Sequence, residues 1–285
     1  MNLFKHKDKN EVMNDDEQHH YNVSCALNHS ENASDLASAS DLISYSTQGT
    51  NGLIFIAYIA SHGEFNQETF EEVSIEEENH EWHRAGIELE TRLEGLRNSA
   101  EGCGYSLCDC KVSLAEYAEP ELDEKNIISI KSLVLRISHN ENFYCSTLEE
   151  AREALLEYCR TNRIPEPNEI ICVVNGYYIK WNFINGFNKD EIKLWRFLQK
   201  KLHESFAKIN PDASECLNTT AMIPVPGFID SNYVVPFDLC ERTTLVYSDD
   251  EKYLSSSDFA SKLSLSASEI AEYRKIMGEH GKNQH

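Results

Sequence analysis

The fold of this chain is decided by the stretch Ile170-Ile-Cys-Val-Val-Asn-Gly-Tyr-Tyr-Ile-Lys-Trp-Asn-Phe183. Two apolar runs flank Asn175-Gly176, a pair that favours a tight turn between antiparallel strands. Residues 170–174 and 177–183 are therefore predicted to form a hairpin. In the second run, Tyr178, Lys180 and Asn182 alternate with apolar side chains, which predicts one apolar and one polar face.

A helix is predicted after this hairpin, because Asn188-x-x-Glu191 is typical of a helix start. Its inner stripe would be Ile192, Trp195, Leu198, Leu202 and Phe206. Its outer face carries the densest basic cluster of the chain, the basic ridge Lys193, Arg196, Lys200 and Lys201. One interpretation is a solvated face that acidic neighbours balance; the other is a surface that contacts phosphates. Pro226-Gly227 then forms a corner among short strand candidates at 221–225, 233–237 and 243–247.

Upstream, residues 53–59 are predicted to form a buried strand, with residues 69–75 as its antiparallel partner. Residues 76–101 are predicted to be helical, with an inner stripe of Trp82, Ile87, Leu89, Leu93 and Leu96. A long strand at 127–138 precedes a helix that Ser146-x-x-Glu149 caps and that runs to Asn162. The order strand, helix, strand predicts a βαβ unit or half of an RRM-like sheet.

Length and composition limit the classes of function. The 285 residues carry a formal net charge of −22, which argues against a surface that binds nucleic acid all over. No signal peptide is visible and the longest apolar run, Leu53–Ala60, is too short for a membrane span of about 20 residues. We therefore expect a cytoplasmic protein with reduced thiols and no membrane partner. Residues 1–50 are predicted to be a disordered arm, 51–248 a domain, and 249–285 a tail with one helix that ends near Met277–Gly278.

His80-x-x-His83 and Cys103-x4-Cys108-x-Cys110 are the candidate ligands for a zinc site. Structural zinc sites use tighter, more regular pairs from compact loops. Buried free cysteines are the favoured interpretation, and no metal ligand set is expected.

Four features in order carry a family resemblance: Val174-Asn175-Gly176, Lys180-Trp181, Trp195 and Pro226-Gly227. Together they resemble the plasmid and phage replication primases of the archaeo-eukaryotic primase superfamily. The resemblance implies an α+β fold, a primase-polymerase-like (RRM-related) mixed sheet packed with helices. It also implies an upstream strand with an Asp-x-Asp pair, whose carboxylates hold two divalent ions for nucleotidyl transfer.

The chain departs from that pattern at every position that carries the chemistry. Arg136 and Ser138 stand at the two carboxylate positions. In the later turn and the strand that follows it, only Asn175 and Lys180 remain as polar residues of the motif. Asn218 stands where an Asp is expected. These five residues are interpreted as a vestigial site that contains no catalytic residue. The sequence therefore favours a protein without enzymatic activity, which needs no cofactor, over an active enzyme.

The expected function is that of a plasmid- or phage-type replication protein whose primase-like domain has lost nucleotidyl transfer. It would bind single-stranded nucleic acid, through Lys180 and the basic ridge, or a replication partner. One alternative is an active primase with Mg or Mn in an atypical site built from Asp212, Glu215, Asp230, Asp238 or Glu141. Another is an acidic α/β interaction module unrelated to replication.

Overall fold

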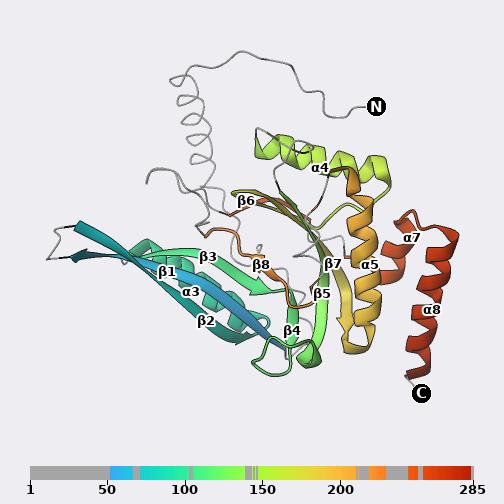
Figure 1. Ribbon diagram of the computed structural model, residues 1–285, viewed down its shortest axis with the longest axis horizontal. Helices are drawn as coiled ribbons and strands as arrows, with labels where there is room; N and C mark the ends of the chain where they lie inside the picture. The colour runs from blue at the N-terminus through green and yellow to red at the C-terminus, as the bar shows by residue number, and fades with distance from the viewer. Residues whose placement is uncertain are drawn as a thin grey trace, which may run out of the picture.

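The computed structural model describes residues 52–66, 71–102, 105–138, 143, 145, 147–209, 211, 218–228, 243–249 and 253–283. These residues form a nine-stranded sheet in the order β8-β3-β1-β4-β5-β7-β6-β9, with β2 paired to β1 (Figure 1). The strands are β1 (Leu53–Asn66), β2 (Glu71–Arg84), β3 (Tyr105–Ser113), β4 (Ala115–Tyr117), β5 (Ile127–Ser138), β6 (Glu169–Val173), β7 (Gly176–Asn188), β8 (Met222–Pro224) and β9 (Thr244–Ser248). The α+β sheet packed with helices is as the sequence predicts, and neighbouring strands pair antiparallel.

The N-terminal half of the sheet has a helix on one face. Ile54, Ile56 and Tyr58 of β1 are buried in a cluster with side chains of α3 (Ile87–Gly102). The intervening β1 residues, including Phe55, are only partly buried on the opposite face. Figure 1 shows α3 on one side of the β1–β2 ribbon.

The helix predicted over residues 76–101 is wrong in its first part. Residues 71–84 form β2, which pairs with β1 so that Leu53 lies opposite Arg84. The helix begins at Ile87, whose side chain is 80% exposed and does not belong to the inner stripe. The physical reason is tertiary: hydrogen bonding to the long strand β1 outweighs the helical preference of the glutamates.

The strand–helix–strand unit is confirmed. β5 and β6 pair with the two edges of β7, and α4 (Leu148–Asn162) connects them. The helix starts one residue later than predicted, because the Thr147 hydroxyl caps it by accepting from the Glu150 N–H at 3.1 Å.

The predicted hairpin is also confirmed, with Val173 opposite Gly176 and a loop of two residues. A Cβ on Gly176 would lie 2.1 Å from the Ile137 carbonyl oxygen, so glycine is required where β7 begins beside β5. The predicted polar side chains share one face of β7, but that face is buried. Every β7 residue from Gly176 to Phe183 is buried.

Helix α5 (Ile192–Ser205) closes an open edge of β5. β4 pairs with β5 only up to Ile130, and no other described strand pairs with β5 on that side beyond this point. The Val134 N–H donates to Gln199 Oε1 at 3.1 Å, and Gln199 Nε2 donates to the Val134 carbonyl. Trp195 Nε1 donates to the Ser132 carbonyl at 3.0 Å. Side chains of α5 thus supply the hydrogen bonds that an adjacent strand would make.

The predicted start of this helix is confirmed as well. Asn188 and Glu191 form a reciprocal capping box around the 3-10 turn η3 (Lys189–Glu191), directly before α5. The five residues of the predicted inner stripe are all buried.

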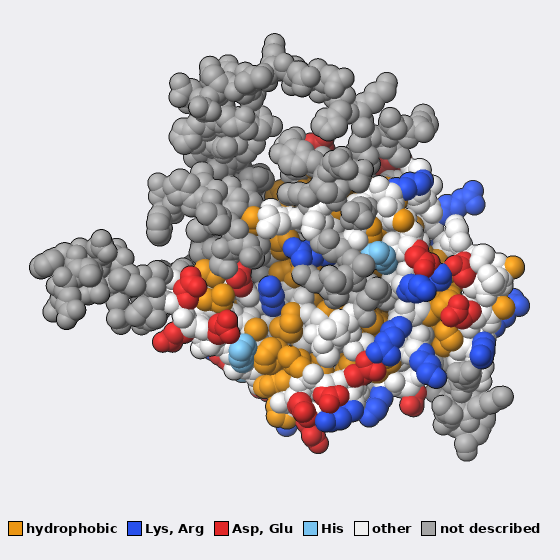
Figure 2. All heavy atoms as spheres, viewed as in Figure 1, with side chains coloured by type: hydrophobic (Ala, Val, Ile, Leu, Met, Phe, Trp, Pro, Cys, Tyr) orange, Lys and Arg blue, Asp and Glu red, His pale blue; other side chains and the backbone are white. Residues whose placement is uncertain are grey.

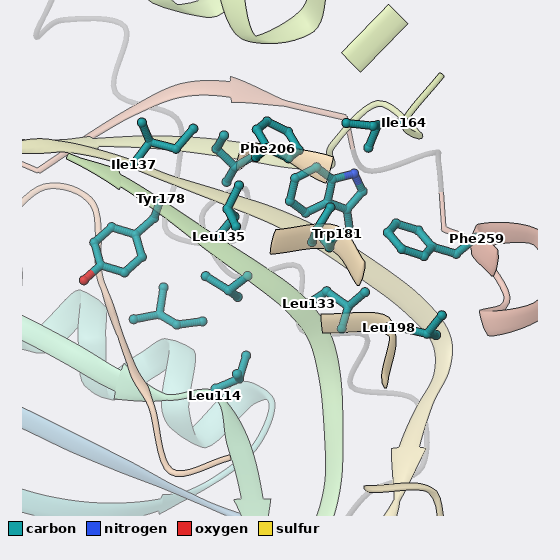
Figure 3. Close-up of a cluster of buried hydrophobic side chains, with 14 of the residues drawn as sticks. Leu114, Leu133, Leu135, Ile137, Ile164, Tyr178, Trp181, Leu198, Phe206 and Phe259 are labelled. Carbon is teal, nitrogen blue, oxygen red and sulfur yellow. The ribbon is translucent and has the colours of Figure 1, made fainter. Parts of the chain in front are cut away.

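The larger core lies between the C-terminal half of the sheet and its helices. Trp181 is fully buried, with its ring 6.0 Å from that of Phe206, and its indole N–H donates to the Pro165 carbonyl at 2.8 Å. Figure 3 shows Trp181, Phe206 and Ile137 on one side of the strands and Tyr178 pointing to the other. This second side is where the predicted site residues lie.

Two helices complete the chain, α7 (Ser256–Lys262) and α8 (Ala267–Asn283). Ser266 precedes α8, and its backbone N–H donates to Glu269 Oε2 at 2.6 Å. The predicted end near Gly278 is wrong, because α8 continues to Asn283. Among the helices described, none is long and apolar enough to cross a membrane.

Candidate functional site

The site predicted from the sequence centres on adjacent strands β5, β7 and β6. Arg136 lies opposite Tyr178, and Val134 lies opposite Lys180. Residues directly opposite share a face, so Arg136 and Lys180 are diagonal neighbours, about 7–8 Å apart. The Arg136 guanidinium carbon lies 5.7 Å from the centroid of the Tyr178 ring. Ser138 lies two residues beyond Arg136 on the same face of β5, so the structure brings three of the five predicted residues together.

Lys180 is held by a carboxylate that the sequence analysis did not single out. Its Nζ lies 2.9 Å from Glu169 Oε1, and the two side chains are 5% and 3% exposed. The same oxygen accepts from Asn182 Nδ2 at 2.8 Å, and Asn182 Oδ1 accepts from the Ser132 hydroxyl at 2.7 Å. The burial and pairing of its ammonium group argue against the predicted contact between Lys180 and nucleic acid.

Asn168 ties this polar network to the backbone. Its side-chain oxygen accepts from the Asn182 N–H at 2.7 Å, and its Nδ2 donates to the Asp249 carbonyl at 3.1 Å. Buried polar groups are tolerated when each has a partner, and they then hold neighbouring strands in one arrangement. The network joins β5, β6, β7 and the end of β9, so its first effect is structural.

The remaining two predicted residues, Asn175 and Asn218, lie apart from each other. Ser138 is the last residue of β5, opposite Gly176, and Asn175 is exposed in the adjacent turn. Asn218 is elsewhere: the neighbouring Thr219 hydroxyl donates to Glu124 at 2.9 Å, just before β5 begins. Arg136 lies nine residues along β5 from its start at Ile127, about 30 Å at the usual rise of a strand. This placement argues against including Asn218 in the site, because its spacing from Gly227 along the chain does not set its position in space.

Acidic side chains pair with most of the basic ridge. Arg196 forms an ion pair with Glu124, and Lys200 lies 3.9 Å from Glu204. Lys201 is only 13% exposed and contacts Glu204 at 2.5 Å and Glu269 of α8 at 2.6 Å. These contacts fit the interpretation of a balanced face better than that of a phosphate-binding ridge.

The described residues include no group of three or more His, Cys, Asp and Glu placed to hold a metal ion. His80 and His83 are three residues apart on β2, so their side chains point to opposite faces. Cys108 and Cys110 are buried in β3, and burial raises the pKa of Cys110 to about 12. Cys103 and the carboxylates of the alternative metal site (Glu141, Asp212, Glu215, Asp230 and Asp238) lie outside the described residues.

Two groups of residues were missed by sequence reasoning. Glu169 could have been found, because a two-residue loop at Val174–Asn175 sets the register that pairs it with Lys180. The partly exposed aromatic side chains of β1 and β2 could not, because residues 76–84 were assigned to a helix.

The chain has an antiparallel sheet packed with helices, and one face of strands β5, β6 and β7 holds an arginine and a lysine–glutamate pair. Neither a protein-family model nor a curated protein matches it.

The solved structures similar to this chain include the following three. The primase-polymerase domain of cyanophage S-2L, of the AEP type, has a TM-score of 0.43 and 9% identity, covering 73% of this chain and 88% of that one. Primase RepB' has a TM-score of 0.42 and 9% identity, covering 87% of this chain, which spans 64% of that structure. The catalytic domain of primase RepB', solved in complex with initiator DNA, has a TM-score of 0.43 and 10% identity, covering 87% and 97%. TM-scores and identities this low do not establish a common function.

Proposed function

We propose that this chain is a replication protein of plasmid or phage type, with a primase-like domain that binds nucleic acid or a replication partner and does not transfer nucleotides. The family is proposed from the ordered motifs between residues 174 and 227. The observation that carries the loss of activity is the buried ion pair between Lys180 and Glu169.

Metal-dependent nucleotidyl transfer needs carboxylates free to ligate two divalent ions. On the face of β5, β6 and β7 described above, Arg136 and Ser138 occupy the two expected carboxylate positions. A guanidinium group cannot ligate a cation, and a neutral hydroxyl is a poor ligand for Mg²⁺. Oε1 of Glu169 already accepts two hydrogen bonds, which a metal would have to displace. The described residues of this face therefore do not fit a pair of Mg or Mn ions.

Ligand-induced stabilisation tests the proposal without requiring turnover. A site that binds a metal–nucleotide complex raises the melting temperature in proportion to the logarithm of ligand concentration. We expect Mn²⁺ with a deoxynucleoside triphosphate to give no more stabilisation than Mn²⁺ alone, which controls for weak metal binding to an acidic chain. A further rise with nucleotide, lost in the Asp212→Asn/Asp230→Asn variant, would favour the active primase.

A further inference from the structure

The open face of the β1–β2 ribbon, opposite α3, carries three aromatic rings in contact. Phe55 lies opposite Trp82, with ring centroids 5.0 Å apart. Phe55 is also stacked on His80, at 5.4 Å and an interplanar angle of 27°. The edge of Trp82 meets the buried ring of Tyr117 at 5.6 Å. This aromatic face (Phe55, His80 and Trp82) is thus held in place from beneath.

The aromatic face is accessible. His80 is exposed, and Phe55 and Trp82 are partly exposed. Figure 2 shows hydrophobic side chains gathered over the β1–β2 ribbon, with a histidine beside them. The other two tryptophans of the chain, Trp181 and Trp195, are fully buried. Trp82 is consequently the tryptophan that a ligand at this face would touch.

Two cations border the aromatic face. Arg84 lies opposite Leu53, and Lys111 of β3 lies opposite Ala57, so both side chains emerge on the face that bears Phe55. Within the described part of the chain, neither side chain makes a hydrogen bond or ion pair. In contrast, Arg196 and Lys201 of the basic ridge are engaged by glutamates.

We propose that this face binds single-stranded nucleic acid. Bases would stack on Phe55, His80 and Trp82, and backbone phosphates would contact Arg84 and Lys111. Aromatic rings on an antiparallel sheet suit unpaired bases, because every base has a π-face, and flanking cations hold the backbone. This inference rests on the part of the proposed function that concerns binding of nucleic acid. It places the contact with nucleic acid on the β1–β2 ribbon.

Acidic side chains limit the length of the site. Glu78 and Glu76 precede His80 on the same face of β2, opposite Ile59 and Ser61, and both are exposed. Their carboxylates repel phosphate, so the bound strand ends at His80. Three rings accommodate about two or three bases.

Tryptophan fluorescence tests the proposal directly on the full chain. A short single-stranded oligodeoxythymidine is titrated at low salt, with the matching duplex as a comparison. We expect saturable quenching by the single strand and little by the duplex. In Trp82→Phe the quenching disappears while binding, measured by anisotropy of a labelled oligonucleotide, persists. Quenching that survives in Trp82→Phe, or no binding at all, would overturn the proposal.

Variants at exposed or partly exposed positions separate this face from the basic ridge. His80→Ala should weaken binding by about tenfold. Arg84→Ala/Lys111→Ala should also reduce the slope of log affinity against log salt concentration by about 1.4, as expected for two phosphate contacts to a single strand. Glu78→Gln should strengthen binding. Lys193→Ala/Lys200→Ala is the matched control with the same charge change; a larger effect there than in Arg84→Ala/Lys111→Ala would contradict the assignment.

The two proposals fail in different experiments. Absence of oligonucleotide binding removes the aromatic face as a nucleic-acid site, and leaves a primase-like domain that binds a protein partner. Nucleotide-dependent stabilisation in the presence of Mn²⁺ would refute the proposed loss of catalysis. It would leave the proposal for the aromatic face unaffected.

Discussion

Lys180 Nζ and Glu169 Oε1 lie 2.9 Å apart, across the two strands of the β6–β7 hairpin and out of contact with water. The pair occupies the face where the resemblance implies a metal site. Because Asn182 donates to the same carboxylate oxygen, the ion pair is part of a network that links three strands. We infer that it holds the sheet together at the position where catalysis would otherwise occur.

Removing Lys180 should therefore act on stability. Lys180→Ala leaves the Glu169 carboxylate buried without its cation, and we expect the free energy of unfolding to fall by about 3–5 kcal/mol. Urea denaturation measures the change. Lys180→Met/Glu169→Gln, which removes both charges but keeps an acceptor for Asn182, should lose less than Lys180→Ala. A loss below about 1 kcal/mol in Lys180→Ala would show that the pair is not buried as described.

Gln199 should be needed to protect the open edge of β5. In Gln199→Leu the Val134 N–H and carbonyl lose their partners while remaining buried, so we expect a loss of about 2–3 kcal/mol. Hydrogen exchange at the Val134 amide should accelerate relative to amides of β7. The exposed Lys200→Ala, one residue further along α5, serves as control. Unchanged protection of Val134 would mean that another group covers this edge.

A pH-dependent contribution is expected at the junction of β2 and α3. Hydrogen bonds from Arg92 lower the pKa of Glu81 from 4.5 to about 2. A carboxylate with a lowered pKa stabilises the fold fully above its unfolded value, and this contribution is lost as the pH falls from about 4.5 towards 2. Glu81→Gln should be less stable than the parent by about 1–2 kcal/mol at pH 6. The difference should shrink by pH 3, measured by thermal or urea unfolding; a constant difference would contradict the lowered pKa.

Lys201 should matter for the docking of α8 and not for nucleic acid. It joins α5 to α8 through Glu269. Lys201→Ala should lower stability by about 1 kcal/mol and make α8 more susceptible to limited proteolysis. Its affinity for the oligonucleotide should change no more than that of Lys193→Ala. A selective loss of oligonucleotide affinity would restore the basic ridge as a binding surface.

Much of the fold was predictable, because the turn, capping and strand-forming residues indicate the same elements as the pattern of buried side chains. The β6–β7 hairpin has its Asn-Gly turn, α5 has its capping box, and β5 is a long β-branched run. β2 was missed because its preference for a strand comes from pairing with β1 and not from its glutamates. This error concealed the aromatic face, which exists only in a strand geometry.

The site was predicted less well than the fold. The correct strands were identified, yet burial of Lys180 and the distance of Asn218 from Arg136 depend on contacts far apart in the sequence. A motif position gives the order of residues along the chain. Whether a polar side chain on that strand faces a ligand or a buried partner is decided by what packs over it.

Template-directed incorporation shows whether the proposed primase-like domain transfers nucleotides. The full chain is incubated with a primed and an unprimed single-stranded template, all four deoxynucleoside triphosphates, and Mg²⁺ or Mn²⁺. An active primase is assayed in parallel. We predict no extension and no primer synthesis above background with either metal. Template-dependent products that disappear in Asp212→Asn/Asp230→Asn would contradict the account and establish a working metal site.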